Sequence, residues 1–380
     1  MPTDPPGSPS ILLLACDDWA SACRLPAAAH AAGFTVHAFA HRDHLVHRSR
    51  FVDQRFEAPP ADTLGALAPH PLSMMQECAA DLVVPVDDGA VALIAMLLPL
   101  LPVQTDPRAP ALLRTLLRSV GSPRHYGRIH RKLGAIEVGS EAGMRVPATA
   151  PCGSPGALEA FVGEHGFPVV LKGDLGCAGQ EVRVCGDAES AALARVDLAV
   201  HSPCVQAFVP GRLAMVNATL WQGEVVASAS FLKRACHPGP TGPSSVVEHV
   251  DEPALDAAMA AFARYTGLSG IVSLDFVLSP DGPVLLECNP RTTPVSHLAS
   301  LTGVDLFGAL RAALSGATAP RAPSGRGPGA PIALFPNELS RDPASPWFCT
   351  AVQDVPWSEP ELVTALLDGV APFSSRPAPG

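Results

Sequence analysis

One segment, residues 272–291, constrains this chain more than any other, because it places charged side chains inside two apolar stretches. It reads VSLDFVLSPDGPVLLECNPR, and its SPDG sequence favours a turn between two strands. Residues two apart in a strand point to the same face of the sheet. The second strand therefore presents three polar side chains on one face: Glu287, Asn289 and Arg291.

The expected hairpin register adds another carboxylate to that face. A loop over Ser279–Pro283 would pair Asp275 with Glu287 and keep the loop's last proline, which has no N–H, out of the ladder. Leu286 and Cys288 would point the other way, into a core. Two carboxylates and an amide oxygen suit Mg²⁺, which shares its shell with phosphates, and an adjacent guanidinium suits a phosphoryl group. A hairpin with ordinary solvated charges is the alternative interpretation.

The composition excludes several classes of function. The 380 residues are 47% hydrophobic and 16% charged, with a formal net charge of -10. This acidic balance argues against nucleic acid or an anionic membrane as the main partner. The 10 cysteines are scattered without a CxxC pair, and the apolar run at 11–16 is too short for a signal segment. A cytoplasmic location is expected, and residues 90–102 are too few to span a membrane.

The N-terminal part alternates strands and helices. Expected strands are Ile11–Cys16, Phe34–Phe39 and Leu82–Val86, and expected helices are Ser21–Ala32, Leu72–Ala80 and Gly89–Leu98. This order predicts a parallel sheet covered by helices, with ligands outside the carboxyl ends of the strands. Asp87 and Asp88 follow the third strand and are either site residues or helix caps.

The remainder has a different pattern. Residues 123–166 are rich in helical sequence, and short, largely antiparallel strands follow. Expected strands or strand residues are Phe167–Leu171, Val182, Val184, Cys204–Val209, Ala214–Leu220 and Val225–Phe231, and expected helices are Pro253–Tyr265 and Thr293–Ala313.

Three shorter motifs are candidates for nucleotide binding. Lys172 ends a strand and precedes a loop with Gly173, Gly176 and Gly179, which could cradle phosphates or form a plain tight hairpin. Residues 206–211 (QAFVPG) could hold an adenine or simply end a strand.

The third motif is basic. Lys233, Arg234 and His237 precede the glycine- and proline-rich residues 239–245. They could face phosphate or substrate, or form a solvated strand end.

In this order the motifs resemble the ATP-grasp superfamily, in particular its carboxylate-amine ligases. The resemblance rests on Lys132 before a helix, the Lys172 loop, QAFVPG, residues 272–291 and Gly303–Asp305, and it covers roughly residues 11–315. It implies an α/β ATP-grasp fold with an N-terminal parallel α/β domain, a small lid domain and a central antiparallel-sheet domain. ATP would lie between two antiparallel sheets.

The resemblance also implies domain limits and residue roles. Expected divisions are a disordered tail (1–10), the N-terminal domain (11–122), the lid (123–205), the central domain (206–318), a linker (319–330) and a C-terminal extension (331–380). Expected nucleotide-binding residues are Lys132, Lys172, Gly176, Gly179, Gln206, Ala207, Phe208, Val209 and Arg234. Asp275, Glu287 and Asn289 would bind Mg²⁺ or Mn²⁺, and Arg291 and Lys172 would act in catalysis.

Three positions depart from the family pattern. Arg131 stands where an Asp often precedes the first Lys, and Gln206 stands where the hinge often begins with Glu. Arg212–Ala214 lacks the acidic residue that commonly binds the ribose. The adenine and ribose contacts are therefore less well defined by the sequence than the metal site.

The expected function is an ATP-dependent ligase that activates a small-molecule carboxylate as an acyl phosphate and joins it to an amine, releasing ADP and phosphate. The alternatives are a bicarbonate-using enzyme of the carboxylase or carbamoyl-phosphate-synthase type, and a non-catalytic nucleotide-binding protein. The sequence leaves open the two substrates, the pathway, the role of residues 331–380 and the oligomeric state, a homodimer included.

Overall fold

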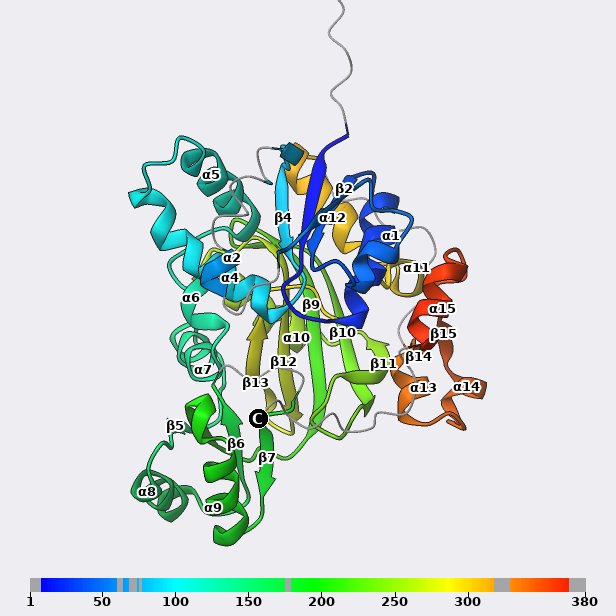
Figure 1. The fold of residues 1–380 in the computed structure, drawn as a ribbon. Helices are drawn as coiled ribbons and strands as arrows, with labels where there is room; N and C mark the ends of the chain where they lie inside the picture. The colour runs from blue at the N-terminus through cyan, green and yellow to red at the C-terminus, as the bar shows by residue number, and fades with distance from the viewer. Residues whose placement is uncertain are drawn as a thin grey trace, which may run out of the picture.

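The computed structural model describes residues 8–59, 64–67, 74, 77–174, 179–317 and 329–368. Within these residues the strands form three sheets, which follow one another along the molecule (Figure 1). The expected mixed α/β fold, with one parallel sheet and two mainly antiparallel sheets, is confirmed. None of the helices in the described part of the chain is long and apolar enough to cross a membrane.

The N-terminal sheet is parallel, with the order β3-β2-β1-β4. Its strands are β1 (Ser10–Leu14), β2 (Thr35–Ala40), β3 (Gln54–Glu57) and β4 (Leu82–Pro85). The sequence did not predict β3, because its four residues are mostly exposed and polar and form no apolar run. Most of the helix expected at residues 72–80 lies outside the described residues.

Helices of this part surround the parallel sheet and lead into the next domain. They are η1 (Ala20–Arg24), α1 (Leu25–Ala31), η2 (Leu45–Arg48), α2 (Leu64–Leu67), α4 (Asp88–Leu100), η3 (Leu101–Val103), α5 (Ala109–Val120), α6 (Tyr126–Ile129) and α7 (Lys132–Glu141). One buried apolar core runs from β1 and β4 through α4 and α5 to the central sheet and its helix α10 (Pro253–Thr266). This shared core fixes the N-terminal domain against the central one.

The small sheet has the order β5-β8-β6-β7. Its strands are β5 (Thr149–Pro151), β6 (Val169–Gly173), β7 (Val182–Cys185) and β8 (Pro203–Ala207), and its helices are α8 (Pro155–His165), α9 (Ala188–Asp197) and η4 (Ala199–His201). Since β8 pairs with β5 and β6, the expected division between residues 205 and 206 falls inside a strand of this sheet. The other domain limits stay predictions.

The central sheet has the order β13-β12-β9-β10-β11-β14-β15. Its strands are β9 (Arg212–Trp221), β10 (Glu224–Cys236), β11 (Ser244–Val250), β12 (Gly270–Ser279), β13 (Gly282–Asn289), β14 (Pro331–Leu334) and β15 (Val352–Asp354). Its last two strands come from residues 331–354, so part of the expected C-terminal extension completes this sheet (Figure 1). Further helices there are α13 (Asn337–Arg341), α14 (Trp347–Thr350) and α15 (Pro360–Asp368).

The hairpin of β12 and β13 has the expected pairing of Asp275 with Glu287, but its turn differs from the expected loop. The turn is tight, with Ser279 opposite Gly282, so Pro283 does pair within the ladder. A proline is tolerated there because β13 is the edge strand of the sheet.

An irregularity next to Asp275 restores the register and changes the face of one side chain. Leu286 is half-buried and lines a cavity, so the expectation that it points into the core is wrong. Leu285 and Cys288 supply the core contacts instead.

The helix expected at residues 293–313 is broken. Residues 293–298 form turns, and α11 (Ala299–Thr302) and α12 (Leu306–Ser315) follow them. Within the turns, Ser296 Oγ accepts a hydrogen bond from the Thr293 N–H at 2.8 Å, and the Ser296 N–H donates to the Thr293 carbonyl at 3.0 Å, a three-residue turn instead of α-helical bonding.

Candidate active site

Two cavities meet at the Asp275–Glu287 pair. The larger has a volume of about 350 Å³ and lies between the small and central sheets. Its walls include Lys172, residues 206–209 and apolar side chains such as Leu213 and Leu286. An apolar slot of this kind, with few polar groups, suits the flat ring of a nucleotide base.

The smaller cavity, of about 100 Å³, is lined by more charged side chains. Trp19 comes from the N-terminal domain, Lys132 from the start of α7, and Asn289 and Arg291 from the end of β13. Lys233, Asp275 and Glu287 line both cavities and therefore form the boundary between them.

Each carboxylate at this boundary is paired with a lysine. Lys233 Nζ lies 3.0 Å from Asp275 Oδ2, and Lys132 Nζ forms an ion pair with Glu287 Oε2. Burial raises the pKa of Asp275 to about 6, although Lys233 counteracts it. Burial also opposes ionisation of Glu287, but Lys132 and the other nearby lysines hold the pKa of Glu287 well below its usual value.

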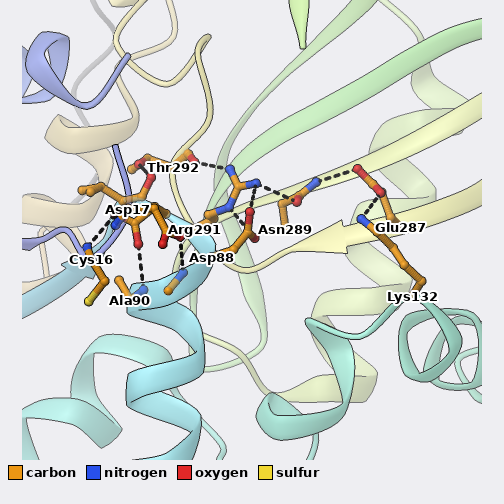
Figure 2. A network of polar contacts seen from close by, with 12 residues as sticks. Cys16, Asp17, Asp88, Ala90, Lys132, Glu287, Asn289, Arg291 and Thr292 are labelled. Atoms are coloured by element: carbon orange, nitrogen blue, oxygen red, sulfur yellow. Dashed lines mark hydrogen bonds and ion pairs between the residues drawn. The ribbon is translucent and has the colours of Figure 1, made fainter. Parts of the chain in front are cut away.

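A linear set of polar contacts joins Glu287 to the N-terminal domain (Figure 2). Asn289 Nδ2 donates to Glu287 Oε1 at 3.3 Å, and Arg291 Nη2 donates to Asn289 Oδ1 at 3.2 Å. Arg291 also donates from Nε and Nη2 to the two carboxylate oxygens of Asp88, both at 2.8 Å. These contacts connect the expected metal-binding side chains to Asp88, which lies 203 positions before Arg291 in the sequence.

Most hydrogen-bonding capacity of Arg291 is already used. Besides Asp88 and Asn289, its Nη1 donates to the Thr292 carbonyl at 3.1 Å, and its guanidinium carbon lies 4.9 Å from the centre of the Trp19 ring. A guanidinium has five N–H groups. These contacts occupy four of them, so among the residues that the structure describes one Nη1–H has no acceptor and can meet a ligand.

The two aspartates after β4 have different roles. Asp87 is the N-cap of α4: it accepts hydrogen bonds from the Ala90 N–H at 2.7 Å and from the Cys16 and Asp17 N–H groups at 2.8 and 3.0 Å. Asp88, in the first turn of the same helix, is the one that contacts Arg291.

Lys172 is the last residue but one of β6 and lines the larger cavity, with a relative exposure of 6%. Burial lowers its pKa, and the nearest opposing carboxylate is that of Glu287. In the described part of the chain no hydrogen bond or ion pair holds its ammonium group. A buried cation without a partner suits an anionic ligand.

The remaining expected nucleotide-binding residues fall in three places. Gln206, Ala207, Phe208 and Val209 line the larger cavity, and Gly179 lines the smaller one. Gly176 lies outside the described residues. Arg234 lines neither cavity: it is exposed and forms an ion pair with Glu248.

Lys233 and Arg234 are neighbours on β10, beside an irregularity in its pairing with β11, and their side chains have different partners: Asp275 for Lys233 and Glu248 for Arg234. Sequence reasoning considered both residues, but only the pairing of Asp275 with Lys233 decides which one enters the site. Trp19 was missed, and Asp88 was considered only as a site residue or a helix cap, because nothing in the local sequence of either indicates contact with residue 291.

The donor set at the cavity boundary fits Mg²⁺. Asp275 and Glu287 supply carboxylate oxygens and Asn289 an amide oxygen, which are hard ligands. The described residues contain no group of three or more His, Cys, Asp or Glu side chains able to hold a metal. An ion here would thus complete its shell with phosphate oxygens and water, as Mg²⁺ ordinarily does.

Comparison with known proteins agrees with this geometry. Residues 132–295 match the family described as an ATP-grasp domain. The chain contains an ATP-grasp domain. The matched range includes every expected site residue, while Trp19, Asp88 and the C-terminal strands lie outside it.

Several solved structures share the fold of this chain. An L-amino acid ligase from Bacillus licheniformis has a TM-score of 0.60 and 16% identity, over 81% of this chain and 74% of that one. An N5-carboxyaminoimidazole ribonucleotide synthetase from Thermus thermophilus has a TM-score of 0.61 and 16% identity, over 84% and 81%.

The biotin carboxylase domain of a Hydrogenobacter thermophilus 2-oxoglutarate carboxylase, solved with MgADP and bicarbonate, has a TM-score of 0.60 and 15% identity, over 84% and 71%. No curated protein matches the chain by sequence at a significant level. At 15–16% identity these neighbours show that the fold is shared.

Proposed function

We propose that this protein is an ATP-dependent carboxylate-amine ligase that forms an amide bond and releases ADP and phosphate. The observation that carries the proposal is the Asp275–Glu287 pair, which forms the boundary between an apolar cavity and a charged one. A nucleotide with its base in the apolar cavity would direct its phosphates across this boundary. The second substrate would meet them from the charged side.

Each residue is assigned a role from its position in the two cavities. Residues 206–209 would hold the adenine, and Lys172 would neutralise a phosphate. Asp275, Glu287 and Asn289 would hold Mg²⁺, which when bound neutralises phosphate charge and polarises the transferred phosphoryl group.

Lys132 and Lys233 each pair with one carboxylate. In the complex they would exchange these contacts for phosphate oxygens. Positioning and electrostatics carry such phosphoryl transfer, so no covalent protein nucleophile is required.

The reaction balances in two steps. An oxygen of the donor carboxylate bonds to the γ-phosphorus, and the bond to the β–γ bridging oxygen breaks, releasing ADP. The amine nitrogen then bonds to the acyl carbon, the bond from that carbon to the phosphate oxygen breaks, and the amine loses a proton. Arg291, through its remaining Nη1–H, would orient an oxygen of the donor or of the acyl phosphate.

A bicarbonate-using reaction is the second candidate. It is favoured by the small volume of the charged cavity, about 100 Å³, and by neighbours that include a bicarbonate-bound biotin carboxylase. In that reaction bicarbonate would take the place of the donor carboxylate and would give carboxyphosphate.

The test is a screen of ADP release with the twenty proteinogenic L-amino acids in pairs, and separately with bicarbonate, followed by mass spectrometry of the products. The best donor is then labelled with ¹⁸O in its carboxylate. Transfer of one label into released phosphate supports the acyl phosphate. Unlabelled phosphate formed alongside the amide would rule out this route, and ATP binding without product from any pair or from bicarbonate would favour a non-catalytic protein.

A further inference from the structure

Two loops line the smaller cavity, and both contact the C-terminal part of the chain. The first loop, residues 239–244, contributes Thr241 to Ser244, and the second loop, residues 293–298, contributes Thr293 to Val295. Of the two, only the first also reaches the larger cavity. The second loop therefore belongs to the substrate side alone.

A largely buried group of three ionisable side chains fixes the second loop. His297 Nε2 lies 2.8 Å from Asp354 Oδ2, at the end of β15. Arg24 from the N-terminal domain donates to both oxygens of the same carboxylate, at 2.9 and 3.1 Å. The side chains of His297 and Asp354 are 7% and 6% exposed. Asp354 thus ties the second loop to the N-terminal domain.

Helix α13 contacts the end of the first loop. Asn337 Nδ2 donates to the Ser244 carbonyl at 3.2 Å. The next residue, Glu338, is 1% exposed and is held by Arg341 and by Ser345. The first loop is therefore attached to the same C-terminal segment as the second.

The C-terminal segment has its own attachments at other points. β14 pairs with β11 from Val246 to Glu248, which extends the central sheet. Glu359 accepts hydrogen bonds from Ser49 Oγ at 2.6 Å and from the Arg50 N–H at 3.0 Å. The segment can thus remain docked when a single contact to a cavity loop is removed.

We propose that residues 331–368 are a positioning segment for the non-nucleotide substrate: Asp354 holds the second loop and Asn337 the first. The proposal rests on the proposed function, in which a carboxylate or amine substrate occupies the smaller cavity. It assigns a role to the sequences FPNELSRDP and DVPWSEPEL, which supply Asn337 and Asp354 and lie beyond the ATP-grasp match.

The first experiment measures loop order without any reaction. Hydrogen exchange is compared in Asp354→Asn, Asn337→Ala and Glu359→Gln. An Asn at position 354 has one acceptor oxygen and no charge, so it loses the two-oxygen contact with Arg24 and the ion pair that fixes its side chain beside His297. Asp354→Asn should speed exchange at least fivefold in residues 293–298, and Asn337→Ala should do so in residues 239–245.

The control, Glu359→Gln, changes a buried carboxylate of the same segment that contacts neither loop. It should leave both loops within twofold of wild type. Unchanged exchange rates in the loops of the Asp354 and Asn337 variants would overturn the proposal. An equal increase of these rates in the control variant would overturn it as well.

The second experiment measures binding and kinetics. With the best substrate pair from the screen, Asp354→Asn should raise KM for a non-nucleotide substrate at least fivefold. The dissociation constant of a non-hydrolysable ATP analogue with Mg²⁺ should stay within twofold. Equal weakening of both would indicate a general structural role and overturn the proposal.

If Asp354→Asn melts well below wild type, Asn337→Ala is the deciding variant, since it removes one hydrogen bond at a half-buried position. If no substrate pair is found, the exchange experiment still decides whether the segment orders the loops. Failure of the proposed function and failure of this proposal are thereby separate outcomes.

Discussion

The two cavities of the site differ in the contacts that hold their lining residues in place. The larger one is lined by residues between 170 and 287, all inside the ATP-grasp match, and they lie on neighbouring strands of two sheets. The lining of the smaller one also lies inside this match, except for Trp19. Two of its parts are held from outside the match: Arg291 by Asp88, and residues 293–298 by Asp354 through His297. The substrate side therefore depends, more than the nucleotide side, on contacts with distant parts of the chain.

Because of this difference, substitutions on the two sides should have different effects. Strand pairing holds the larger cavity, so a change there should alter nucleotide binding alone. On the substrate side, the smaller cavity depends on a charged side chain that already has partners, Arg291 with Asp88 and Asn289. Changes there should affect turnover more than ATP binding.

The largest effect is expected at the boundary shared by the cavities. Glu287→Gln removes a charge expected to bind Mg²⁺, and Mg²⁺-dependent ATP turnover should fall by about 10³-fold, as when a main electrostatic group of a site is lost. Steady-state ADP release at saturating Mg²⁺ measures this. Asp281→Asn, an exposed carboxylate at the turn of the same hairpin, is the control and should keep near-normal turnover. Normal ATP consumption by Glu287→Gln would remove Glu287 from the metal site.

The next effect tests the substrate side. Arg291→Lys cannot reproduce the planar contacts to Asp88 and Asn289, so turnover should fall roughly 10²-fold while affinity for an ATP analogue hardly changes. Turnover of Asp88→Asn should lie between those of Arg291→Lys and wild type, because this variant weakens the contact that orients Arg291 but keeps the guanidinium. Comparable losses in ATP affinity and turnover would show that the two cavities are not separable at Arg291.

The nucleotide side is tested by Lys172→Ala. An interaction with a charged group contributes roughly 1.5–3 kcal/mol, so affinity for the ATP analogue should fall by about tenfold to 100-fold. Isothermal titration calorimetry measures the change. Arg234→Ala, at the exposed ion pair with Glu248, should leave this affinity unaltered. An effect of Arg234 equal to that of Lys172 would restore the sequence-based assignment of Arg234.

The pH dependence should report on Asp275. Its pKa is raised to about 6 mainly by burial, so the carboxylate becomes protonated as the pH falls through this value, and Mg²⁺ must then displace a proton. The apparent dissociation constant of Mg²⁺ should rise by about tenfold per unit of pH below 6 and stay nearly constant from about pH 7 to 8. Titrations of nucleotide turnover with Mg²⁺ at each pH test this. A constant affinity down to pH 5 would contradict the raised pKa.

The smallest effect concerns the contact between the loop after β6 and the first cavity loop. Gly179 has a φ of +69°, and a Cβ atom there would clash with the Thr241 carbonyl oxygen. Gly179→Ala should displace this contact and cost about 1 kcal/mol, a change of about fivefold in KM. Unchanged KM values for ATP and for both substrates would show that the contact has no role in binding.

Several features of the site were predictable from local sequence. The alternation of Glu287, Asn289 and Arg291 and the pairing with Asp275 follow from strand geometry, and the pairing is confirmed. Gln206 to Val209 and Lys172 line the larger cavity, in keeping with their expected positions. These residues lie on adjacent elements, so the side-chain period of two in a strand is enough to place them.

Other features were not predictable from local sequence. The position of Leu286 depends on an irregularity in the ladder, which slips one side chain to the other face. The choice between Lys233 and Arg234 depends on the register of β10 with its neighbours, and a shift of one residue would reverse it. The four residues of β3 carry no apolar pattern because the strand is largely exposed.

The sequence by itself determined the chemistry of the ATP side: which carboxylates, lysine and apolar residues are available, and on which strands they lie. Only the tertiary structure decided the substrate side, where Asp88 meets Arg291 and Asp354 meets His297. The physical reason is that strand periodicity acts over a few residues. Ion pairs across 203 or 57 positions form only after the domains have packed.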